Sequence, residues 1–212
     1  MLTDIQIEDL AGRMKVPLET VCFKDKIPKI LKPNKTYIIN LQDSKTDDGK
    51  FNSGTHWVML QVCKTPKGNV YPFYFDSYGA PPPEIVIKRV KDNFGKTLPY
   101  NKKDIQSLMN NACGYYCLAL AHYINTFDMR TNDFYVDIDD FLEMFDDLNE
   151  SIDWKKNEYV LKLFFQAEDK SKRKPVDVYS QTHDDYERII NKDGGRLDMM
   201  RIPVETKMIN KR

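Results

Sequence analysis

The sequence is poor in histidine and cysteine, and it has no excess of either charge. Its 212 residues include three histidines and four cysteines, and 32 basic residues balance 32 acidic ones. Balanced charge gives no overall attraction to nucleic acid or to an anionic membrane surface. The cysteines and histidines also lack the spacing of a zinc site. We therefore expect neither a metal nor a cofactor.

Long apolar runs are also missing. No stretch approaches the ~20 apolar residues that a helix needs to span a bilayer. The first 14 residues lack the basic start and the unbroken apolar run of a signal peptide. We therefore expect a soluble globular chain without membrane contact, in a reducing compartment where its thiols stay free.

Hydrophobic spacing predicts a mixture of helices and strands. Helices are expected over about 4–14, 84–93, 112–125, 139–148 and 155–168, and the first has Thr3 and Gln6 at capping-box spacing. Strands are expected over 37–41, 56–64 and 70–76. The segment 56–64 is apolar on both alternating faces, which is typical of a central strand. Because regular βαβ alternation is missing, the predicted fold class is α+β.

The composition divides the chain into a domain over 1–168 and a polar C-terminal extension over 169–212. The extension contains the basic segment 170–174, which is usually a solvated hinge, with weak nucleic-acid contact as the alternative. The acidic segment 137–150 fails as a calcium loop because Leu142 and Leu148 occupy the positions of the required glycine and glutamate. We interpret it as a solvated helix face.

The turn sequence TPKGN brings His56 close to Asp76. If this turn closes a hairpin, residues whose numbers sum to about 133–135 face each other. His56 then faces a position near 77–79, within a few residues of Asp76. Side chains opposite or diagonal across a ladder lie about 5–8 Å apart at Cβ. An imidazole and a carboxylate can close that distance.

Cys113 lies in the predicted first turn of a helix, with Asn110 and Asn111 as N-cap candidates. Free backbone N–H groups and the helix dipole favour a thiolate there, and the same groups can hold an oxyanion. Gly114 removes a side chain where a substrate backbone would approach. The amide of Gln106, seven residues upstream, is a second candidate oxyanion donor.

Each of these residues also has an ordinary structural interpretation. Alone, His56 is most often a partly buried strand residue, Asp76 a turn former, Cys113 a small core residue and Gln106 a surface amide. The combination favours chemistry because the other bases are poorly placed. His122 lies about half a turn around the predicted helix from Cys113, and the third histidine lies in the polar extension.

Three motifs in this order resemble the adenovirus maturation protease family and the related ubiquitin-like-modifier proteases. They are GTHW (54–57), YFDSYG (74–79) and IQSLMNNACGYYC (105–117). The segments IEDLAGRM and DLNESIDWKKNEYVLKLFF are similar to the forms carried by virophages and polinton-like viruses. The resemblance covers about residues 2–168. It implies a mixed central sheet flanked by helices, with the nucleophile at a helix N-terminus.

The resemblance also implies a role for each matching residue. Cys113 corresponds to the nucleophile, His56 to the general base, Asp76 to the acid that orients it and Gln106 to an oxyanion donor. Trp57 matches a tryptophan that packs at the active site, and we place it with Gly114 among the substrate-binding residues.

The implied activity is that of a cysteine endopeptidase that cleaves after glycine, at Gly-Gly-X or Gly-X-Gly sites. Its implied substrates are viral capsid precursors, processed during virion maturation in the host cytoplasm and in the virion, and we expect a monomer. Two alternatives remain open: a protease that removes a ubiquitin-like modifier from lysine, and a non-catalytic, capsid-associated peptide-binding module. The pair Gly194-Gly195 also suggests self-cleavage, although the preceding Lys192 differs from the apolar residue that relatives prefer.

Overall fold

The computed structural model describes residues 1–126, 134–149, 154–169, 174–177 and 198–199. The chain divides into two compact units, Met1–Asn157 and Glu158–Arg212. The division falls inside helix α5 (Trp154–Phe164). Each unit is described by itself.

A four-stranded mixed sheet forms the centre of the first unit. Its strands are β1 (Leu18–Phe23), β2 (Lys35–Asn40), β3 (Trp57–Lys64) and β4 (Val70–Phe75), in the order β1-β2-β3-β4. Strand β1 runs parallel to β2, and the other two pairings are antiparallel. The α+β class and the three predicted strands are confirmed. Strand β1 was not predicted.

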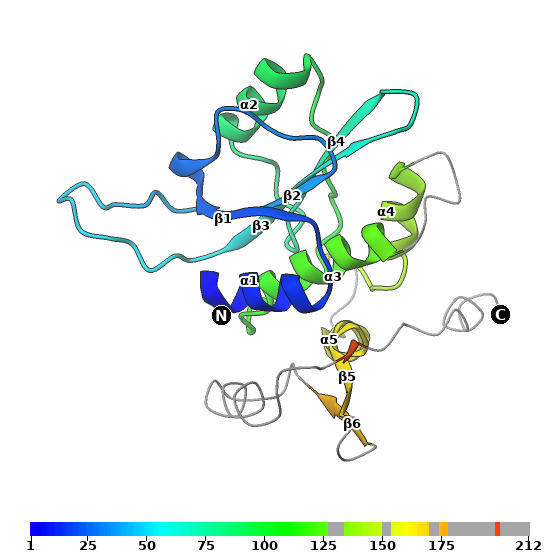
Figure 1. Cartoon of the computed structure of the whole chain (residues 1–212). Coiled ribbons are helices and arrows are strands. Elements are labelled where there is room, and N and C mark those ends of the chain that lie inside the picture. The colour runs from blue at the N-terminus through cyan, green and yellow to red at the C-terminus, as the bar shows by residue number, and fades with distance from the viewer. Residues whose placement is uncertain (127–133, 150–153, 170–173, 178–197, 200–212) are drawn as a thin grey trace. The chain divides into compact units, whose positions relative to one another are not determined.

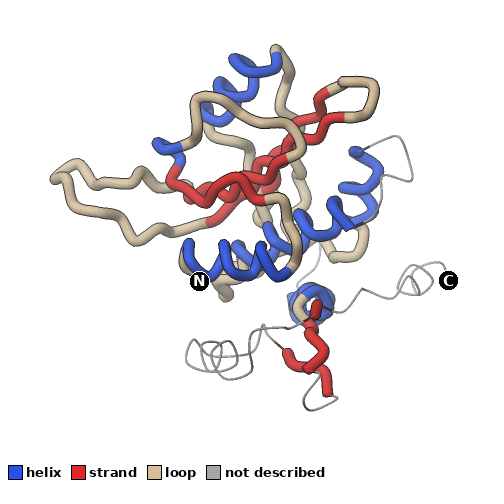
Figure 2. Tube along the Cα trace, viewed as in Figure 1, coloured by secondary structure: helices blue, strands red, loops and turns tan. Residues whose placement is uncertain are grey.

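Helices cover both faces of this sheet (Figures 1 and 2). On one face, Val86 and Val90 of α2 (Glu84–Phe94) join a core with Val58, Leu60 and Tyr74 of the sheet. Helices α1 (Asp4–Arg13) and α3 (Cys113–Thr126) lie on the other face. Strand β3 is therefore buried on both faces from its first residue to its seventh, as its unbroken apolar sequence predicts.

Local signals set the ends of the first two helices. The side chain of Thr3 accepts from the N–H of Gln6, and the Gln6 side chain accepts from the N–H of Thr3, so the predicted capping box is present. Helix α2 ends at Gly95, whose φ of 63° closes the helix in the left-handed conformation. A short 3-10 helix, η1 (Lys24–Lys26), follows β1.

The hairpin of β3 and β4 has the predicted register. Met59 faces Phe75 and Leu60 faces Tyr74, which lies within the expected range. The ladder ends at Met59 and Phe75, so His56 and Asp76 both lie just beyond it, at the same end of the sheet.

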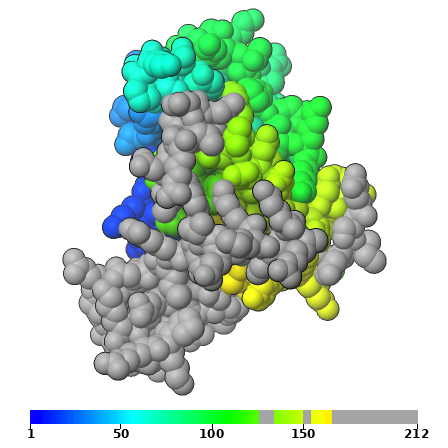
Figure 3. Space-filling view, turned by 90° about the vertical axis from the view of Figure 1, so that its right-hand side faces the viewer, coloured from blue at the N-terminus to red at the C-terminus, as the bar shows by residue number. Residues whose placement is uncertain are grey.

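Two predicted helices had wrong boundaries. The helix expected over 139–148 is α4 (Phe134–Leu142), and turns follow it. Figure 3 shows the surface of this part of the chain in yellow-green. Phe141 and Phe145 are buried, whereas Leu142 and Leu148 are only partly buried. The apolar spacing starts at Phe134 and continues past the last helical turn, so the pattern alone did not locate either end.

The helix expected over 155–168 ends at Phe164. Strand β5 (Gln166–Asp169) follows it and pairs with β6 (Lys174–Asp177) and β7 (Asp198–Met199) in a second, three-stranded sheet. Most of the basic segment 170–174, and all of Gly194-Gly195, lie outside the described residues. Within the described ranges, no helix is both long and apolar enough to cross a membrane.

Candidate active site

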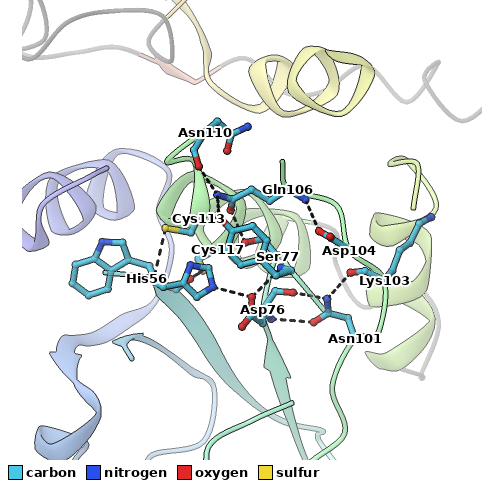
Figure 4. Close-up of polar contacts among 12 residues, drawn as sticks. His56, Asp76, Ser77, Asn101, Lys103, Asp104, Gln106, Asn110, Cys113 and Cys117 are labelled. Carbon is cyan, nitrogen blue, oxygen red and sulfur yellow. Dashed lines mark hydrogen bonds and ion pairs between the residues drawn. The ribbon is translucent and has the colours of Figure 1, made fainter. Parts of the chain in front are cut away.

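Three elements meet at the candidate site. His56 immediately precedes β3, Asp76 immediately follows β4, and Cys113 is the first residue of α3. Figure 4 shows the imidazole of His56 between the sulfur of Cys113 and the carboxylate of Asp76. The His56 Nε2 atom lies 2.8 Å from Asp76 Oδ1. The hairpin and α3 thus bring together the three residues that the sequence singled out.

Asp76 is held rigidly. Its side chain is buried, and Oδ1 accepts a second hydrogen bond from the N–H of Tyr78 at 2.9 Å. The amide of Asn101 bonds the Asp76 backbone twice, accepting from its N–H at 3.0 Å and donating to its carbonyl at 2.6 Å. The carboxylate therefore has little freedom to leave the imidazole.

Cys113 lies at an uncapped helix N-terminus. The expected N-caps were wrong, because α3 begins directly after Ala112, whose methyl group cannot cap a helix. Asn110 instead accepts from the N–H of Ala112 at 3.3 Å. Among the described residues, no acceptor takes the backbone N–H of Cys113. That N–H group is available to a ligand beside the sulfur.

The imidazole of His56 is held in its charged form. Burial is the largest influence and lowers the pKa of His56, but the hydrogen bonds and negative charges of Asp76 and Cys113 outweigh it and raise the pKa to about 9. At neutral pH the ring is therefore an imidazolium. Since Nε2 is engaged by Asp76, Nδ1 is the nitrogen left to exchange a proton with Cys113.

Only one of the four thiols has this environment. Burial is the main cause that raises the pKa of Cys22 and of Cys63 to about 12. Cys117 is fully buried, which raises the pKa of its thiol, and its sulfur donates to the Trp57 carbonyl at 3.5 Å. Cys117 is thus a core residue. Cys113 is the thiol that neighbours a charged imidazole.

Gln106 lies in the same site, on the loop between α2 and α3. It is buried, and its Oε1 accepts from the hydroxyl of Ser77 at 2.6 Å. Its Nε2 donates to the hydroxyl oxygen of Tyr78 at 3.0 Å and to the carbonyl of Asn110 at 3.1 Å. The amide expected to hold an oxyanion therefore has both of its hydrogens engaged.

Trp57 and Gly114 contact the N-terminal segment. The indole Nε1 of Trp57 donates to the carbonyl of Leu2 at 2.9 Å, while its backbone N–H points at the Cys113 sulfur, 3.4 Å away. A Cβ added at Gly114 would meet Leu2 Cδ1 at 3.3 Å and Ile7 Cδ1 at 3.4 Å. The structure thus gives a different reason for glycine at 114, which is close packing against the first residues of the chain.

The remaining candidates lie elsewhere. The Nδ1 atom of His122 lies 2.9 Å from the carbonyl of Met14, and burial lowers the pKa of this imidazole. The third histidine, His183, lies outside the described residues. In the part of the chain that the structure describes, no three acidic, histidine or cysteine side chains gather where they could hold a metal ion.

Sequence reasoning missed Ser77, Tyr78 and Asn101. The ring of Tyr78 stacks on His56 with a centroid separation of 4.7 Å. The hairpin register places a residue near 77–79 opposite His56, so the contact between Tyr78 and His56 could have been predicted from it. The contacts of Ser77 and Asn101 depend on turns whose geometry the spacing does not determine.

Comparison with models of known protein families gave no match, and comparison with curated proteins gave none either.

Proposed function

We propose that this chain is a cysteine endopeptidase of the adenovirus maturation protease type, with Cys113 as its nucleophile. The observation that carries the proposal is the imidazole of His56, bonded through Nε2 to the buried Asp76 and charged beside the Cys113 sulfur. An imidazolium at a helix N-terminus stabilises a neighbouring thiolate, which is the reactive form of cysteine.

In the proposed reaction, the Cys113 sulfur attacks the scissile carbonyl carbon and a C–S bond forms. The Nδ1 proton of His56 passes to the amide nitrogen as the C–N bond breaks. Water then attacks the thioester, gives a proton to Nδ1 and releases the acid product and the thiolate. Asp76 keeps Nε2 engaged in both steps, so that Nδ1 stays directed at the reacting atoms. Water is the only other reactant that this chemistry requires.

Glycine on the acyl side of the cleaved bond fits this site. The side chain and backbone of Cys113 are together only 2% exposed. A substrate residue must therefore come close to the surrounding walls before its carbonyl carbon reaches the sulfur. Glycine adds no side chain to that approach. We propose glycine-containing sites in capsid precursors as the substrates, in keeping with the motifs that resemble the viral proteases.

Cleavage of a Gly-Gly-X peptide library, read by mass spectrometry, tests this function. Wild type should cleave after glycine, Cys113→Ala should not, and Cys22→Ala, which removes another thiol, should cleave like wild type. Selective labelling of Cys113 by iodoacetamide without cleavage of any peptide would favour removal of a ubiquitin-like modifier. A Cys113 that neither cleaves nor labels selectively would favour the non-catalytic module and contradict the proposal.

A further inference from the structure

The amide of Gln106 has a determined orientation. The carbonyl of Asn110 can only accept a hydrogen bond, so the amide end that faces it must be Nε2. Oε1 then faces Ser77, whose hydroxyl must donate to it, because two oxygens without a hydrogen between them repel. The partners on the two sides therefore allow only one orientation of this buried amide.

The same logic assigns the hydrogen of Tyr78. The second Nε2 hydrogen of Gln106 is donated to the Tyr78 hydroxyl oxygen, 3.0 Å away. That oxygen acts as an acceptor, so its own hydrogen is directed elsewhere. No described residue accepts that hydrogen, and Tyr78 is only half-buried. Among the residues that the structure describes, the site thus contains one O–H donor without an acceptor.

The residue that carries this hydroxyl lies against two residues of the candidate site. The Tyr78 ring stacks on the imidazole of His56, and its backbone N–H donates to the carboxylate of Asp76. Burial is the main cause that raises the pKa of Tyr78, and the charge of Cys113 raises it further, so the hydroxyl keeps its proton at neutral pH. Gln106 polarises the hydroxyl by donating to its oxygen, which strengthens the bond that the O–H can make.

We propose that the hydroxyl of Tyr78 donates to the oxyanion that forms when Cys113 attacks a carbonyl. Gln106 is then a positioning residue, which holds and polarises Tyr78, and the backbone N–H of Cys113 is the second donor. This inference rests on the proposed acyl transfer at Cys113, and it assigns to Tyr78 the role that the motifs suggested for Gln106. Donors fixed in place before the reaction are the most effective oxyanion stabilisers.

The variant Tyr78→Phe isolates the hydroxyl. It keeps the ring that stacks on His56 and the backbone N–H that bonds Asp76. Loss of one oxyanion donor typically lowers kcat by about 10²-fold or more. We expect that loss in Tyr78→Phe, with KM little changed. Tyr71→Phe, which removes a tyrosine hydroxyl from β4, is the matched control and should cleave like wild type.

Two thiol reagents separate this role from a general loss of structure. Alkylation of Cys113 by iodoacetamide forms no oxyanion, so its rate should be equal in wild type and Tyr78→Phe. Acylation by p-nitrophenyl acetate passes through an oxyanion, so it should slow by the same factor as peptide cleavage. Cleavage and acylation by Tyr78→Phe at the wild-type rate or faster would overturn the proposal and return the donor role to Gln106.

The ester also distinguishes the two proposals. Rapid acylation of wild type that slows in Tyr78→Phe, without cleavage of any peptide, would support the Tyr78 donor and contradict the endopeptidase function. Slower alkylation of Tyr78→Phe would show that the hydroxyl positions His56 instead, and would also overturn the donor role. A wild-type Cys113 that is not acylated at all would overturn both proposals.

Discussion

The charged state of His56 is the property from which the proposed chemistry follows, and it is open to direct measurement. Its pKa of about 9, against an ordinary value of 6.5, corresponds to about 3 kcal/mol of preference for the imidazolium. Asp76 and Cys113 supply this preference against the opposing effect of burial. The side chain of His56 is only 14% exposed, so solvent screens these interactions weakly.

Replacing Asp76 with asparagine should lower the pKa of His56 by more than Cys113→Ala does, because the larger of the two hydrogen-bond contributions comes from Asp76. The double variant should titrate below 6.5, since burial is then the main influence left. The assay is an NMR titration of the histidine side chains, with the His56 signal assigned from its absence in His56→Gln.

Asp25→Asn is a suitable control for this titration. Desolvation opposes the shift, but hydrogen bonds from Ser44 and the neighbouring Lys26 lower the pKa of Asp25 to about 2, so this exposed carboxylate is also charged at neutral pH. Its removal should leave the titration of His56 unchanged. A wild-type His56 that titrates near 6.5, or one that Asp76→Asn does not shift, would refute the electrostatic argument.

Three further predictions concern stability. Gly79→Ala should destabilise the fold by about 2 kcal/mol or more, because φ is +70° and the new Cβ would lie 2.6 Å from a backbone oxygen. The control Gly68→Ala, at φ +87° with open space, should cost about 1 kcal/mol. Equal losses of the two variants in urea unfolding would contradict this reasoning. Asn101→Ala removes three hydrogen bonds from a buried side chain and should cost about 2–3 kcal/mol in the same assay. A loss below about 0.5 kcal/mol would show that the hydrogen bonds of Asn101 contribute little to stability. Since folding raises the pKa of His56, the contribution of this residue to stability is complete below about pH 6.5 and is lost as pH rises through about 9. The stability difference between wild type and His56→Gln should therefore shrink over that pH window. A difference that grows with pH would contradict the argument.

The sequence predicted those parts of the site that local patterns determine. Alternation and the turn TPKGN determine the hairpin register, and the register places His56 and Asp76 at one end of the sheet. Helical spacing placed Cys113 in a first turn, and α3 begins at this residue. Each of these inferences uses residues close together in the chain or a fixed structural period.

The parts that the sequence did not predict depend on contacts between distant segments. Strand β1 (Leu18–Phe23) is partly exposed along its whole length, and only its parallel pairing with β2 defines it. The amide of Gln106 was expected to face a ligand, but its orientation depends on Ser77 and Tyr78, about 30 residues earlier in the chain. Glycine at 114 was explained by a substrate, whereas its neighbours in the structure belong to the first residues of the chain.

The most direct test of the central claim is to trap the acyl-enzyme. A Gly-Gly-X peptide is mixed with wild type and quenched in acid within milliseconds to seconds, and the tryptic peptide that contains Cys113 is sequenced by mass spectrometry. The same tryptic peptide contains the buried Cys117, which serves as an internal control thiol. The account predicts the mass of the glycyl fragment as a thioester on Cys113, none on Cys117, and none on either in His56→Gln. Cleaved peptide without acylation of Cys113, or acyl groups shared between the two cysteines, would contradict it.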